Sequence, residues 1–80
     1  MQPITNEAIF EILKSEFTDA IIEVVGDGYK YQALIVSSDF TGLSTVKRHQ
    51  KIYSVLKDAI ASGSLHALTL KTLTPDEYSP

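Results

Sequence analysis

The chain has 80 residues, of which 44% are hydrophobic, and a formal net charge of −3. A chain of this length forms one small domain of modest stability, because folding buries only about 60% of the surface that the unfolded chain exposes. It contains no cysteine, which excludes disulfides, thiolate ligands to a metal and a thiol nucleophile.

The hydrophobic residues are spread along the chain. No apolar run approaches the roughly 20 residues that span a bilayer. The first residues, Met1-Gln2-Pro3, lead into a polar helix start instead of the apolar core of a signal peptide. We therefore expect one domain over residues 1–80, soluble and cytoplasmic, with no membrane partner.

The N-terminal part predicts a helix followed by a β-hairpin. Thr5 can cap a helix over about residues 6–17, in which apolar side chains recur at helical spacing. Residues 20–25 and 29–36 are rich in strand-forming side chains. Between them, Gly26-Asp27-Gly28 has the composition of a tight turn.

A long amphipathic helix is predicted next. Gly42 permits a sharp entry and Ser44 can serve as N-cap of a helix that runs to about residue 61. At 100° per residue, one half of its wheel is apolar and predicts the face that packs on the core. His49 falls in this half, which favours a buried, hydrogen-bonded imidazole over a metal ligand. The apolar residues of this half are Val46, Ile52, Tyr53, Val55, Leu56, Ala59 and Ile60.

The C-terminal part predicts a third strand. Ser62-Gly63-Ser64 can end the helix, residues 65–73 alternate as a strand, and Thr74-Pro75 can cap a terminal turn. The second strand, the long helix and the third strand form a βαβ unit. Because such crossovers are right-handed, the third strand should lie parallel to the second. The predicted fold is a small α+β sandwich with the order α-β-β-α-β.

This topology predicts a site at one edge of the sheet. Parallel strands begin at the same edge, so His66 should lie beside Tyr29 and Lys30, next to the hairpin turn. We expect His66 at the rim of the helix-covered face, where its imidazole can offer a nitrogen to a metal or a partner. Spacing alone favours a structural histidine, and a ligand is the alternative.

Several of these motifs together resemble the BolA-like family. They are the Phe40-Thr41-Gly42 turn, the basic helix start with Arg48-His49, and the strand start His66-Ala67-Leu68. The resemblance covers roughly residues 5–78, and Gly42 and His49 are its structural signature. It implies a three-stranded mixed sheet with helices on one face, related to the KH-like fold. It also implies either partnership with a monothiol glutaredoxin in iron–sulfur handling or transcriptional regulation.

The resemblance also implies a ligand set. In the family, the histidine equivalent to His66 binds a two-iron two-sulfur cluster shared with a monothiol glutaredoxin. The second ligand is usually a histidine or cysteine of the hairpin loop, where this chain has Lys30, whose ammonium group cannot bind iron. Asp27 can take that role, the partner can supply another ligand, or cluster sharing is weakened. A simple hairpin turn with a solvated lysine is the alternative interpretation of the loop.

Basic residues mark the start of the long helix. Lys47, Arg48 and Lys51 can contact phosphates or an acidic partner, although a solvated charged face is the default interpretation. For DNA binding, residues 40–60 would form a helix-turn-helix-like element. Three or four phosphate contacts give a log–log salt slope of only about −3, so a single copy should bind weakly. We expect a monomer or a weak homodimer, and a metal-free adaptor is a third possibility.

No catalytic constellation is visible in the sequence. It has no Cys-His or Ser-His-Asp spacing, no glycine-rich phosphate loop and no Gly-x-x-Gly clamp, so we predict that the protein is not an enzyme. Two histidines without cysteine fall short of a four-ligand zinc site, so any metal must be shared with another molecule. Four aromatic residues are expected to pack in the core or at its rim instead of stacking on bases: Tyr29, Tyr31, Phe40 and Tyr53.

Overall fold

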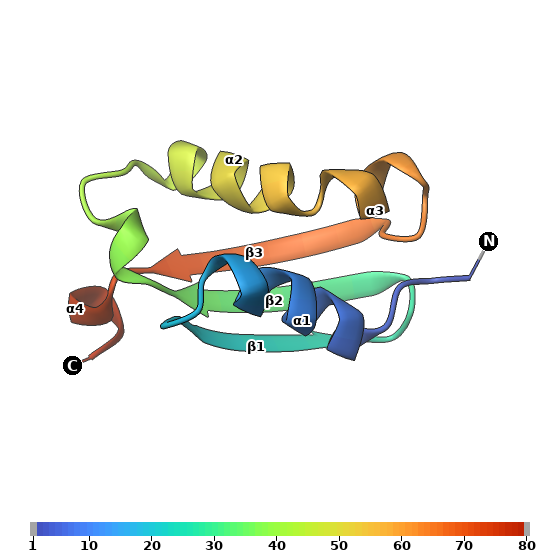
Figure 1. Cartoon of the computed structure of the whole chain (residues 1–80), viewed down its shortest axis with the longest axis horizontal. Helices are drawn as coiled ribbons and strands as arrows, with labels where there is room; N and C mark the ends of the chain where they lie inside the picture. Colours follow the sequence, from blue (N-terminus) through green and yellow to red (C-terminus); the bar gives the residue numbers. More distant parts are fainter. Residues whose placement is uncertain (1, 80) are drawn as a thin grey trace.

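The computed structural model describes residues 2–79 and has the predicted α+β architecture (Figure 1). A three-stranded sheet lies behind α1 and below α2 in this view. The longest helices have 11 residues, so in the described range no helix is long and apolar enough to cross a membrane. The elements are α1 (Asn6–Glu16), β1 (Ile21–Gly26), β2 (Lys30–Val36), the 3-10 turn η1 (Ser38–Phe40), α2 (Thr45–Val55), α3 (Lys57–Ala61), β3 (Ala67–Leu73) and α4 (Pro75–Tyr78).

The sheet has the strand order β1-β2-β3, with β1 antiparallel and β3 parallel to β2. The parallel pairing runs from Lys30 opposite Ala67 to Val36 opposite Leu73. This confirms the βαβ unit predicted from the handedness of crossovers. Each strand begins one or two residues later than predicted, so His66 lies just before β3 instead of inside it.

The core lies between the helices and one face of the sheet. Alternate residues of β2 point toward the helices, in keeping with the period of two in a strand. The hydroxyl of Tyr31 donates a hydrogen bond to the carbonyl of Ile4 over 2.6 Å, which ties the N-terminal segment to the sheet. The largest fully buried side chains are Ile9, Leu13, Tyr31, Ile35, Phe40, Ile52 and Leu56.

Short-range capping contacts fix the helix starts, as predicted. The Thr5 and Ser44 side chains accept hydrogen bonds from the N–H groups of Ala8 and Lys47, over 3.0 and 3.3 Å. Gly42 has a φ of +82°, which supplies the sharp entry into α2 that other residues resist. Because these caps satisfy otherwise unpaired N–H groups, they define where each helix begins.

The predicted long helix differs from the structure in two ways. It is divided at Leu56, where ψ is +11°, into α2 and α3. The predicted apolar half of the helix is also wider than the face that is buried, since Val46, Tyr53 and Ile60 are 66%, 41% and 40% exposed. These three lie roughly 80–120° from Ile52 around the helix, and the narrow sheet below covers only the arc near Ile52 and Leu56. They form an apolar stripe along the flank of the helix.

The predictions for the aromatic residues and His49 are correct only in part. His49 is half-buried at the margin of the contact, not enclosed in the core. Tyr31 and Phe40 are core residues, whereas Tyr29 is 61% exposed. The buried rings of Tyr31 and Phe40 therefore come from β2 and η1, whereas Tyr29 lies near the end of the sheet where β2 and β3 begin.

Candidate functional site

His66 lies where the sequence predicted, beside the hairpin turn at one edge of the sheet. The N–H of the next residue, Ala67, donates to the carbonyl of Tyr29 over 3.2 Å. The rings of His66 and Tyr29 lie 5.4 Å apart between centroids, with their planes tilted by 37°. The side chain of His66 is exposed. Tyr29 therefore supports one side of an imidazole that an external ligand can reach.

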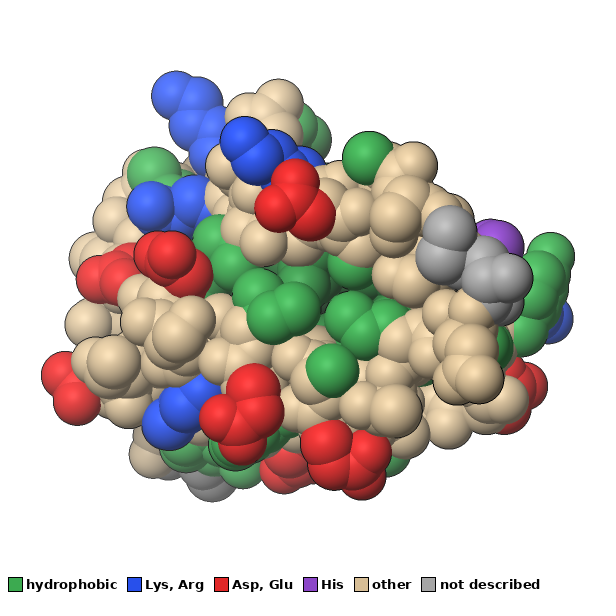
Figure 2. Space-filling model, turned by 45° about the vertical axis from the view of Figure 1, so that its right-hand side comes forward, with side chains coloured by type: hydrophobic (Ala, Val, Ile, Leu, Met, Phe, Trp, Pro, Cys, Tyr) green, Lys and Arg blue, Asp and Glu red, His purple; other side chains and the backbone are tan. Residues whose placement is uncertain are grey.

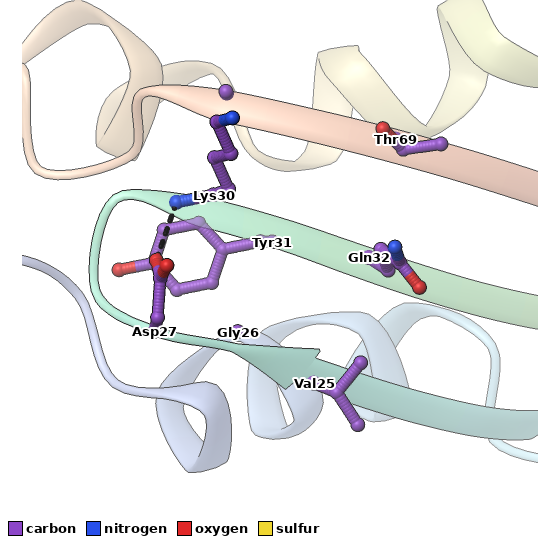
Figure 3. A pocket seen from close by; sticks show the side chains of 8 residues that line it. Val25, Gly26, Asp27, Lys30, Tyr31, Gln32 and Thr69 are labelled. Atoms are coloured by element: carbon purple, nitrogen blue, oxygen red, sulfur yellow. Dashed lines mark hydrogen bonds between the residues drawn. The ribbon is translucent and has the colours of Figure 1, made fainter.

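The hairpin turn next to this histidine is held by Asp27 (Figure 3). Its Oδ1 atom accepts hydrogen bonds from the N–H groups of Tyr29 and Lys30, over 2.9 and 2.8 Å. Figure 3 draws the bond from Lys30. These two bonds, that from Lys30 first, lower the pKa of the Asp27 carboxyl below its usual value. One oxygen of Asp27 therefore shapes the turn, and the carboxylate stays charged at neutral pH.

The donor set at this edge is too small to hold a metal alone. Within residues 2–79, no three histidine, aspartate or glutamate side chains are close enough to hold a metal ion. Lys30 pairs with Ala67 at the start of the parallel ladder, and its ammonium group is not a ligand. An exposed imidazole fits one position of an iron–sulfur cluster, as histidine ligands do in known clusters. A cluster bound at this imidazole would need its other ligands from a second molecule.

A groove of about 620 Å³ has His66 in its lining. It is walled by the exposed Tyr53 and Ile60 from the flank stripe and by the buried Leu65. Sequence reasoning missed this groove, because it assigned Tyr53 and Ile60 to the core. Their separation by seven residues is the signal that puts them on one flank. The complete lining is Tyr53, Lys57, Ile60, Ala61, Leu65, His66 and Leu68.

The three basic residues at the start of α2 have different surroundings. Lys47 and Lys51 are exposed, whereas the side chain of Arg48 is only 11% exposed. The guanidinium of Arg48 donates to the carbonyls of Leu43 and Thr72 and to both carboxylate oxygens of Glu77. Four of its five N–H donors are thus used within the chain. Lys47 and Lys51 remain free to meet a partner.

The charges are segregated on the face in Figure 2. Hydrophobic side chains gather at its centre, lysine and arginine side chains border them above, and acidic side chains predominate below. The upper border is the side of α2, which carries Lys47, Arg48 and Lys51. A basic, partly apolar surface therefore lies along α2, although the chain as a whole is acidic.

Comparison with known proteins supports the sequence resemblance. A family model described as BolA-like protein matches residues 11–77. The acid stress protein IbaG of Escherichia coli K12 is 34% identical over 92% of this chain and 88% of its own length. The DNA-binding transcriptional regulator BolA of the same strain is 34% identical over 91% of this chain and 78% of its own. A solved bolA homologue from Coxiella burnetii superposes with a TM-score of 0.84 at 31% identity, covering 96% of this chain and 99% of that one.

Proposed function

Because the chain belongs to the BolA-like family, we propose that it is a non-enzymatic partner of a monothiol glutaredoxin in iron–sulfur cluster handling. In this proposal His66 supplies one ligand to a two-iron two-sulfur cluster that the two proteins share. The observation that carries the proposal is the exposed imidazole of His66 at the end of the sheet, which contacts the ring of Tyr29 and helps to line a largely apolar groove.

The surroundings of His66 suit a ligand that acts only in a complex. The contact with Tyr29 limits the orientations of the ring, which lowers the entropy lost on binding. The groove lined by Tyr53, Ile60 and Leu65 gives the partner an apolar surface next to the ligand. Bound there, the cluster would supply a redox-active or transferable iron–sulfur group. The protein's part is to present one nitrogen and a docking surface.

Lys30 has an electrostatic role in this proposal. Thiolate-bound iron–sulfur clusters are anionic, and nearby charge is one of the factors that tune them. Lys30 begins β2 directly opposite the residue that follows His66. Its ammonium group cannot bind iron, but it can offset negative charge on the shared cluster. Asp27 remains with the turn that it caps.

The test is anaerobic co-purification with a monothiol glutaredoxin, followed by visible circular dichroism of the complex. We expect the mixed complex to give a spectrum distinct from that of the glutaredoxin alone. In His66→Ala, the spectrum should revert to that of the glutaredoxin alone while the far-UV spectrum stays native. His49→Gln, which alters the other histidine, is the matched control and should keep the mixed spectrum. An unchanged mixed spectrum in His66→Ala would contradict the proposal.

DNA binding is the second candidate function. It is supported by the relative named a DNA-binding transcriptional regulator and by the exposed Lys47 and Lys51 on α2. The guanidinium of Arg48 already donates hydrogen bonds to Thr72 and Glu77 within the chain. With two phosphate contacts, the log–log salt slope would be about −2 for one copy. Useful affinity would therefore require two copies on one DNA molecule.

A further inference from the structure

One face of the sheet is turned away from the helices, and two neighbouring rows of side chains in its middle form an exposed surface. The first row is Val25, Gln32 and Thr69, one from each strand, and Figure 3 shows it in front of the helices. The second row is Glu23, Leu34 and Lys71. Adjoining depressions of about 630 and 330 Å³ share all three residues of the first row. We call these six residues the open face.

The open face has an apolar centre and opposite charges at its sides. Val25 is 59% exposed, and Leu34 is half-buried between the two charged residues of its row. Glu23 on β1 and Lys71 on β3 are both exposed. In the described part of the chain, the single ion pair is that of Arg48 with Glu77, so Glu23 and Lys71 are both without a charged partner. Their strands are separated by β2, about 10 Å from backbone to backbone, and the two side chains form no ion pair with each other.

From this pattern we propose that the open face binds a second copy of the same chain. In this dimer the open faces of the two copies lie against each other, related by a two-fold axis that is parallel to β2 and midway between the two sheets. The axis places β1 of each copy opposite β3 of the other. Glu23 of each copy then faces Lys71 of the other, and Leu34 faces its own equivalent. In the first row, Gln32 faces Gln32, and Val25 faces Thr69. The register thus makes the surface self-complementary, as an isologous dimer requires.

The small area of the open face determines how tightly the two copies should bind each other. Two rows on three strands bury far less than the roughly 1,200 Å² at the lower limit of stable interfaces. We therefore expect a weak, concentration-dependent and salt-sensitive dimer. The open face is opposite the helices, whereas the groove beside His66 is lined by α2, α3 and β3 residues. The two surfaces meet only at the hairpin, because the larger depression of the open face extends to Asp27 and Lys30.

Charge reversal tests the pairing of Glu23 with Lys71. Glu23→Lys and Lys71→Glu should each place like charges opposite each other twice in the dimer, and weaken self-association by about tenfold. An equimolar mixture of the two variants should associate at least as tightly as the wild type, because every lysine then faces a glutamate. Sedimentation equilibrium from micromolar to millimolar protein measures all four samples. A wild type that stays monomeric at millimolar concentration, or a mixture that stays monomeric, would overturn the proposal.

Cross-linking tests the position of the axis. Because the chain has no cysteine, Gln32→Cys introduces a unique thiol on the axis and Thr69→Cys a matched one off it. Facing sheets lie about 10 Å apart, which places the Gln32 Cα atoms about 10 Å and the Thr69 Cα atoms about 14 Å from their equivalents. A short bismaleimide should therefore join Gln32→Cys and leave Thr69→Cys largely monomeric. Equal cross-linking of both variants, or none, would contradict the axis along β2.

Discussion

Arg48 and Glu77 form a two-pronged ion pair that joins the start of α2 to the C-terminal helix. The Nη1–Oε1 and Nη2–Oε2 distances are 2.7 and 3.3 Å. The same guanidinium donates to the carbonyl of Leu43 and, at the end of β3, to that of Thr72. Glu77 in turn accepts from the N–H of Thr74 and completes the capping box of α4. One arginine thus holds three segments together.

This pair predicts a loss of stability in acid. The hydrogen bond from Arg48, followed by that from Thr74, lowers the pKa of Glu77 from 4.5 to about 2. A carboxyl whose pKa falls on folding stabilises the protein fully above its unfolded pKa, and this contribution is lost as the pH falls through the folded value. Glu77→Gln should therefore melt below wild type at neutral pH, and the difference should shrink as the pH falls from 4.5 to about 2.

Melting temperature measured against pH checks this prediction. Asp76→Asn removes a neighbouring acid of α4 that has no ion pair in the described structure, and is the matched control. The melting temperature of Asp76→Asn should stay close to that of the wild type at every pH. A constant gap between Glu77→Gln and wild type down to the acid limit would show that the ion pair does not carry this stability.

Burial of the helix face predicts a large effect at Leu56 and a small one at Ile60. Leu56 is 1% exposed, whereas Ile60, four residues on, is 40% exposed. Leu56→Ala should cost about 2–5 kcal/mol of unfolding free energy, a large share of the stability of so small a domain. Ile60→Ala should cost roughly 1 kcal/mol or less. Chemical denaturation measures both, and equal costs would refute the assigned facing of the helix.

The basic residues of α2 should separate into binding and structural ones. If DNA binding occurs, Lys47→Ala and Lys51→Ala should each reduce the salt slope by about one unit and leave the melting temperature nearly unchanged. Arg48→Ala should lower the melting temperature, because it removes the hydrogen bonds to Thr72 and Glu77. Salt titrations and thermal melts distinguish the two classes. If neither lysine substitution changes the DNA affinity or its salt dependence, the surface of α2 is not the DNA contact.

A histidine in place of Lys30 should strengthen the shared cluster. Lys30→His adds a neutral nitrogen donor at the start of β2, where the wild type has a cation. The mixed complex should then lose iron to a chelator more slowly than wild type. Lys30→Ala is the control that removes the charge without adding a donor, and it should not slow the loss. Equal rates in Lys30→His and Lys30→Ala would show that no ligand position exists there.

The caps and the strand order could be predicted because they depend on short-range chemistry and one topological rule. Thr5, Ser44 and Thr74 cap helices as their side chains indicate. The right-handed crossover placed His66 beside Tyr29 from two segments far apart in sequence. These features need no knowledge of long-range packing.

The features that sequence reasoning missed depend on tertiary contacts. Arg48 and Glu77 are 29 residues apart, and nothing in either local pattern indicates the other. Tyr53 and Ile60 are apolar and lie in the hydrophobic half of the wheel, yet the sheet is too narrow to cover them. The groove beside His66 exists for that reason, so it became visible only in the folded chain.

The most direct test of the account is whether a nitrogen of His66 is bound to iron. We would label the histidines of this chain with ¹⁵N, form the complex with an unlabelled monothiol glutaredoxin, reduce the cluster and record pulsed electron paramagnetic resonance. His49→Gln leaves His66 as the one labelled histidine. We predict a ¹⁵N hyperfine coupling that persists in His49→Gln and disappears in His66→Ala. A cluster-loaded complex without ¹⁵N coupling in the wild type would contradict the assignment of His66 as a ligand.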